Sequence, residues 1–75
     1  MEDPELLNLI NQVLENSGYE PIAWLADGLH LRNDLGLDSF HLAELTVRIE
    51  DATGIDIFSD GIVDTIADIK AKLKK

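Results

Sequence analysis

Apolar residues recur at helical spacing near the start of the chain. The pattern predicts a helix over about residues 4–16, with Asp3 as its N-cap and Pro4 at the first helical position, where the missing N–H would be unpaired anyway. Gly18 is placed to end this helix. Its single apolar face consists of Leu6, Leu7, Ile10, Val13 and Leu14.

Two further helices are predicted in the second half of the chain. The first covers residues 39–53, with Asp38 or Ser39 as its cap and Gly54 as its stop. The last begins near Thr65, where Thr65-Ile66-Ala67-Asp68 fits a capping box, and its buried stripe is Ile66, Ile69 and Leu73. A weak helical turn is expected between them, over residues 60–63.

Residues 19–37 show no clean period but hold many apolar side chains. We expect a long connection laid over the core, with a short helical turn near residues 21–26 and Trp24 anchoring the loop to the core. No segment has a strand pattern of useful length. The predicted fold is therefore all-α, a single domain over residues 1–75 with three main helices, one short helix and a long first loop.

The helix predicted over residues 39–53 has two apolar faces. On a wheel of 100° per residue, one arc is assigned to the core; it holds Leu42, Leu45, Ile49 and Ala52. The other arc, roughly opposite, holds Phe40, Ala43 and Val47 and is flanked by Glu44, Glu50 and Asp51. This second arc is either a docking strip inside an acidic rim, or covered by the long loop over Phe40, or ordinary scattered surface.

Charge and composition narrow the function classes. The 75 residues include 15 acidic and 6 basic ones, for a net charge of −9, which disfavours binding to nucleic acid. Four lysines lie in the last six residues, so residues 1–69 carry 15 acids against two arginines, a net of −13, which favours basic partners. The chain has no cysteine and only two histidines, eleven residues apart, so neither disulfides nor a metal site is expected. It shows no signal-peptide pattern and no membrane span, and we expect a cytoplasmic monomer.

The most informative segment runs from Asp34 to Phe40 and places a serine at the head of a helix. By itself, Asp38-Ser39 is an ordinary helix cap. The stretch Leu35-Gly36-Leu37-Asp38-Ser39, however, resembles the acyl carrier protein signature. The helix that follows is similar to its family counterpart in register, as are the segments Ile55-Asp56-Ile57 and Thr65-Ile66-Ala67-Asp68-Ile69.

The resemblance implies a four-helix bundle of acyl-carrier type whose Ser39 carries 4′-phosphopantetheine, attached by a phosphopantetheinyl transferase using coenzyme A. Asp38 would help to present the serine, and the arm's thiol would hold acyl groups as thioesters. Partner enzymes that load and accept these groups would bring basic patches to a docking surface that matches Asp38, Phe40, Ala43, Glu44, Val47, Glu50 and Asp51. The acyl chain would lie between helices, against Leu45, Thr46, Ile49, Ile57 and Ile62.

Some positions depart from the family pattern and leave alternatives open. Phe40, His41 and Arg48 alter the docking helix, which indicates a specialised carrier, for example in polyketide, modified-lipid or glycan acylation, rather than the general carrier of fatty-acid synthesis. Arg48 is expected to pair with Glu44. His30 is expected in the loop and His41 on the surface. Rival hypotheses are an aminoacyl or peptidyl carrier and an unmodified acidic helical interaction module. Nothing resembles a catalytic triad or paired-carboxylate site, so we predict that the chain is not an enzyme.

Overall fold

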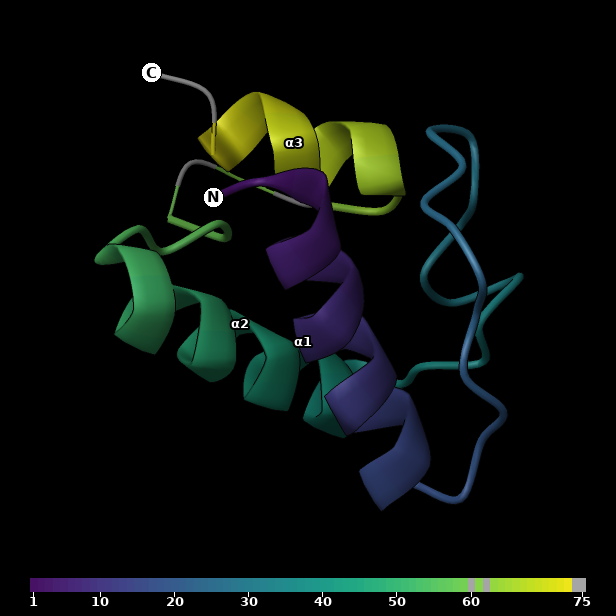
Figure 1. Ribbon diagram of the computed structural model, residues 1–75. Coiled ribbons are helices and arrows are strands. Elements are labelled where there is room, and N and C mark those ends of the chain that lie inside the picture. Colours follow the sequence, from purple (N-terminus) through teal and green to yellow (C-terminus); the bar gives the residue numbers. More distant parts are fainter. Residues whose placement is uncertain (60, 62, 74–75) are drawn as a thin grey trace.

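The computed structural model describes residues 1–59, 61 and 63–73. It has three helices, α1 (Asp3–Asn16), α2 (Ser39–Thr53) and α3 (Ile66–Leu73), and no strand within these residues. In Figure 1, α1 crosses α2, and α3 lies across the end of the molecule at which α1 begins. The all-α prediction is thus confirmed.

The ends of α2 follow the local signals in the sequence. The Asp38 carboxylate accepts a hydrogen bond from the His41 backbone N–H at 3.1 Å, and Gly54 ends the helix in the left-handed conformation with φ 77°. A residue with a Cβ is strained in that conformation, so glycine suits the position. Both predicted boundaries of this helix are confirmed.

The other two helices begin by similar devices, with one correction. α1 starts at Asp3 rather than Pro4, and its N-cap is Glu2, whose backbone N–H donates to Glu5 Oε1 at 3.2 Å. Asp3 was the wrong cap because the acidic start of the chain offers two neighbouring candidates. At α3 the predicted capping box is present: the Asp68 N–H donates to Thr65 Oγ1 at 3.2 Å and the Thr65 N–H to Asp68 Oδ2 at 3.1 Å.

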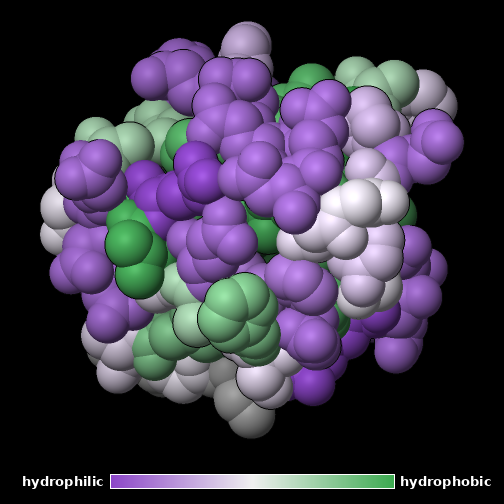
Figure 2. Space-filling view, turned by 90° about the horizontal axis from the view of Figure 1, so that it is seen from below, coloured by the Kyte–Doolittle hydropathy of each residue, from purple (hydrophilic) through white to green (hydrophobic). Residues whose placement is uncertain are grey.

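The outward face of α2 is exposed. Phe40 is 75% and Val47 63% exposed, so the loop does not cover Phe40. Ala52, assigned from the helical wheel to the core, is exposed as well, because α2 ends one residue later and its last turn passes beyond the packed interior. Seen from below the orientation of Figure 1, the surface in Figure 2 shows apolar areas set between hydrophilic ones.

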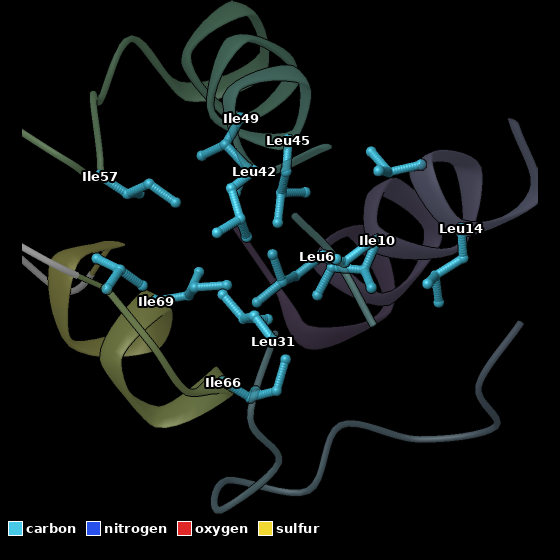
Figure 3. Packing of buried hydrophobic residues seen from close by; sticks show 13 residues of the cluster. Leu6, Ile10, Leu14, Leu31, Leu42, Leu45, Ile49, Ile57, Ile66 and Ile69 are labelled. Carbon is cyan, nitrogen blue, oxygen red and sulfur yellow. The ribbon is translucent and has the colours of Figure 1, made fainter. Parts of the chain in front are cut away.

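The inward faces of the three helices share one core. In Figure 3, Leu6 of α1 lies among side chains from α2, α3 and the first loop, with Ile10 beside it and Leu14 farther along α1. The buried hydrophobic residues are Leu6, Ile10, Val13, Leu14, Leu31, Leu37, Leu42, Leu45, Ile49, Ile57, Val63, Ile66 and Ile69. Burial of this apolar surface is the main stabilising term for so small a domain.

The long connection between α1 and α2 is held by buried leucines and by backbone hydrogen bonds to the start of α3. Leu31 and Leu37 are buried in the core, as a loop laid over the core requires. The backbone of residues 27–31 also pairs with the start of α3: the Leu31 N–H donates to the Asp64 carbonyl at 2.7 Å, and the Ile66 N–H to the Leu29 carbonyl at 3.1 Å. The loop therefore takes its shape from α3, which follows it by more than thirty residues.

The loops contradict two of the sequence expectations, and a third falls partly outside the described residues. Trp24 does not anchor the loop, since 71% of its surface is exposed, and residues 23–24 form a bend rather than a helical turn. A bend after Pro21 turns this stretch outward, and Ile22 and Leu25 cover the core instead. The short helix expected over residues 60–63 includes Asp60 and Ile62, which lie outside the described residues; residues 57–59 form a turn.

Candidate functional site

Ser39 is the first residue of α2, and it is exposed. The turn before it explains this placement. Gly36 has φ 77°, and its N–H donates to the Arg32 carbonyl at 3.1 Å, which reverses the chain between two leucines. Leu37 then enters the core, and Asp38 and Ser39 follow on the outside. The stretch that resembles the carrier signature therefore folds into a turn that presents one serine to solvent.

Asp38 fixes the first turn of α2. The hydrogen bond from the His41 backbone N–H is the main cause that lowers the pKa of the Asp38 carboxyl below its usual value of 3.8. The His41 ring and, more weakly, the Arg32 guanidinium act in the same direction. Asp38 is therefore an anion at neutral pH beside the Ser39 hydroxyl.

His41 is less exposed than the sequence suggested. Its side chain is 17% exposed, its Nδ1 lies 3.0 Å from Asp38 Oδ1, and its ring meets that of Tyr19 edge-on with centroids 5.6 Å apart. This histidine thus supports the start of α2. The expectation of an ordinary surface residue was wrong because Tyr19 comes from the loop after α1, which sequence spacing does not place beside α2.

Arg32 is a site residue that the sequence reasoning missed. Its Nη2 donates to Ser39 Oγ at 3.0 Å. The available signal was weak: Arg32 is one of only two basic residues before position 70 and lies seven residues ahead of the serine. Only the folded turn shows that the two side chains meet.

An open groove of about 520 Å³ starts at Ser39 and runs along α2 toward the segment after it. Thr46 is the one predicted acyl-cavity residue on its wall; Leu45, Ile49 and Ile57 are fully buried in the core, and Ile62 lies outside the described residues. Phe58, which the sequence did not single out, closes the far wall. The groove is lined by Arg32, Ser39, Leu42, Ala43, Thr46, Val47, Glu50, Asp56 and Phe58.

The predicted docking residues lie on the same helix as the groove. Phe40, Ala43, Val47, Glu50 and Asp51 are exposed, as is Asp38. Glu44 is partly buried, and its Oε2 forms the predicted ion pair with Arg48 Nη2 at 3.0 Å. This pairing reduces the negative potential on one edge of the strip.

The site combines an exposed hydroxyl, an adjacent guanidinium and an open groove with both apolar and charged side chains. A family model described as phosphopantetheine attachment site matches residues 5–73. The chain belongs to this family. Its members are carriers of covalently attached 4′-phosphopantetheine and are not catalysts, so this carrier is not an enzyme.

Searches of curated proteins and of solved structures give no match for the carrier. Two further findings concern membrane spans and metal sites among the described residues. They contain no helix long and apolar enough to cross a membrane. They also contain no group of three or more histidine and carboxylate side chains placed to hold a metal ion.

Proposed function

We propose that the chain carries acyl groups as thioesters on a 4′-phosphopantetheine arm attached to Ser39 Oγ. The observation that supports this most is the place of Ser39, exposed at the head of α2 and at the mouth of the groove. The other two serines are placed differently. Ser17 is the C-cap of α1 and is partly buried, and the Ser59 hydroxyl donates to the Asp56 carbonyl at 3.0 Å.

The residues around Ser39 fit a phosphopantetheine group chemically. The hydroxyl supplies the oxygen for the phosphodiester, and the Arg32 guanidinium is a phosphate-binding donor. The groove offers apolar side chains such as Leu42 and Phe58 for the pantetheine and acyl methylenes. With no cysteine in the chain, the thiol that bears the thioester comes from the arm.

The outward face of α2 is the proposed docking surface for partner enzymes. Phe40 and Val47 present apolar area inside a rim of Asp38, Glu50 and Asp51. Such a surface matches a partner with an apolar contact framed by lysines and arginines, because opposite charges steer the encounter. The proposed partners are a phosphopantetheinyl transferase and the enzymes that load and accept the acyl group.

The proposed cargo is an acyl rather than an aminoacyl group, because Glu50 and Asp51 make the outward face of α2 acidic and aminoacyl or peptidyl carriers are usually less acidic there. The carrier with its arm attached is offered to a fatty-acyl adenylating enzyme and, separately, to an aminoacyl adenylating enzyme. The expected result is acylation of the arm's thiol by the first enzyme, seen as a mass gain that hydroxylamine removes. Loading by the aminoacyl enzyme alone would contradict the acyl assignment. The variant Ser39→Ala, which cannot hold the arm, is the control in both reactions.

A further inference from the structure

The contact between Arg32 and Ser39 joins two segments that the chain separates by a complete turn. Arg32 Nη2 lies 3.0 Å from Ser39 Oγ, while the Arg32 carbonyl accepts the Gly36 N–H at 3.1 Å. The same turn thus fixes the Arg32 backbone and aims its side chain at the hydroxyl. A guanidinium that donates to a neutral hydroxyl makes a weaker hydrogen bond than it would make to an anion.

The two arginines of the chain differ in their partners. Arg48 pairs with Glu44 at 3.0 Å and donates to Gln12 Oε1 at 2.9 Å. Among the residues that the structure describes, no carboxylate forms an ion pair with Arg32. In a chain with nine surplus negative charges, a guanidinium that donates to a hydroxyl and forms no ion pair with a described carboxylate is available for an incoming anion.

A phosphodiester on Ser39 would need such a cation. It would carry one negative charge next to the Asp38 carboxylate, which already accepts the His41 backbone N–H. Glu50 and Asp56 add two carboxylates on the groove wall. Without a neighbouring cation, these groups would repel the phosphate from the groove and leave the arm directed into solvent.

We propose that Arg32 is a positioning residue that binds the phosphodiester on Ser39 and directs the arm into the groove between α2 and Phe58. The inference rests on the proposed attachment at Ser39. On attachment, the guanidinium moves its hydrogen bond from Oγ to the free phosphate oxygens, for which its planar fork is suited. The first part of the arm then lies over Leu42 and Thr46.

The test compares four proteins: wild type, Arg32→Gln, Arg32→Lys and the control Arg48→Gln, which removes the same charge from α2 at a position nine residues after Ser39. Each is prepared with and without the arm, and intact mass confirms attachment. The readouts are the ³¹P NMR chemical shift of the phosphodiester as a function of NaCl, and the difference in melting temperature between the two forms.

The wild type and Arg48→Gln are expected to share one ³¹P shift, and Arg32→Gln to differ from both. The difference in melting temperature between the forms with and without the arm should be about 1 to 5 °C smaller in Arg32→Gln than in the wild type, as expected for loss of one exposed ion pair. In Arg32→Lys, which keeps the charge, the decrease should be smaller. NaCl near 0.5 M should reduce the difference between wild type and Arg32→Gln in both readouts, since it screens exposed charges.

Two outcomes would overturn the inference, and they are distinguishable. If the arm attaches to all four proteins but Arg32→Gln and Arg48→Gln behave alike in both readouts, Arg32 does not hold the phosphate, and the proposed function stands. If no protein acquires the arm on Ser39, the proposed function itself fails, and the role of Arg32 fails with it.

Discussion

The Asn11 side chain makes a closed pair of hydrogen bonds with the backbone of Ile22. Asn11 Nδ2 donates to the Ile22 carbonyl at 3.0 Å, and Asn11 Oδ1 accepts the Ile22 N–H at 2.8 Å. The pair is partly buried and joins the middle of α1 to the first part of the long loop. The side-chain amide of Asn11 therefore satisfies both the N–H and the carbonyl of Ile22, which lies outside the helices and has no backbone partner in a regular element.

Replacing Asn11 with alanine should destabilise the protein by about 1 to 3 kcal/mol, because both backbone groups of Ile22 lose their partner in a partly buried place. Urea unfolding followed by circular dichroism measures this. Asn8→Ala is the matched control on the same helix: Asn8 is exposed, and its loss should change stability by less than about 0.5 kcal/mol. Equal effects of the two substitutions would show that Asn11 does not hold the loop.

Sequence reasoning succeeded where structure is decided locally. Asp38 and Gly54 bound α2 because caps act within one helical turn, and the Thr65–Asp68 box is equally local. Ser39 was singled out by the resemblance of residues 35–39 to the carrier signature, since its cap position alone is an ordinary one. Most of the core stripes of α1 and α3 followed from helical period, since one face of each helix meets the interior, but Leu7 and Leu73 are only partly buried.

The N-cap of α1 and the burial of Ala52 were local failures, and the others involve contacts between segments that helical spacing does not bring together. Arg32 meets Ser39 only because Gly36 reverses the chain, and His41 is partly covered because Tyr19 lies against it. Trp24 was expected to anchor the loop to the core, yet it is exposed, and its smaller neighbours Ile22 and Leu25 pack against the core instead. No period or spacing in the sequence carries this information.

The start of α3 supplies a second stability prediction. Thr65→Ala removes the hydroxyl that accepts the Asp68 N–H and should cost about 0.5 to 2 kcal/mol, the usual range for loss of an N-cap. Ser59→Ala is the control, because its exposed hydroxyl bonds only to a nearby carbonyl in a turn. Thermal melts of the two variants give the comparison, and a Thr65→Ala melt that matches wild type would refute the cap.

Two caps make the fold sensitive to acid. The backbone N–H groups of Asp64 and Thr65 lower the pKa of Asp68, as His41 lowers that of Asp38. Because both pKa values fall below the usual 3.8 on folding, these carboxylates stabilise the native state above about pH 4. That contribution is lost as the pH falls through the lower, folded-state values.

Melting temperature against pH, from 7 down to 2, tests this. Wild type should lose stability below about pH 4, where the unfolded carboxylates bind protons first. Asp68→Asn removes one of the two carboxylates. Its melting temperature should be lower than that of the wild type at pH 7 and should decrease less as the pH falls. If the wild-type and Asp68→Asn curves run parallel across the acid range, the Asp68 cap does not contribute to acid sensitivity.

Two exposed aromatic residues allow a clean test of the docking surface. Phe40 and Trp24 are 75% and 71% exposed, so alanine at either position should leave the fold intact. Only Phe40 lies on the proposed docking face. Phe40→Ala should lower kcat/KM of a phosphopantetheinyl transferase for the carrier by about 5- to 30-fold, a loss of 1 to 2 kcal/mol typical of a central interface residue. Equal rates for Phe40→Ala and Trp24→Ala would place the docking surface elsewhere.

The attachment of the arm to Ser39 is the central claim, and intact mass tests it most directly. The purified carrier is incubated with coenzyme A, magnesium and a broad-specificity phosphopantetheinyl transferase, with Ser39→Ala and Ser59→Ala treated in parallel. We predict a gain of one phosphopantetheine group in the wild type and in Ser59→Ala, and none in Ser39→Ala. A folded wild type that gains no mass, or a Ser39→Ala variant that gains it, would contradict the account.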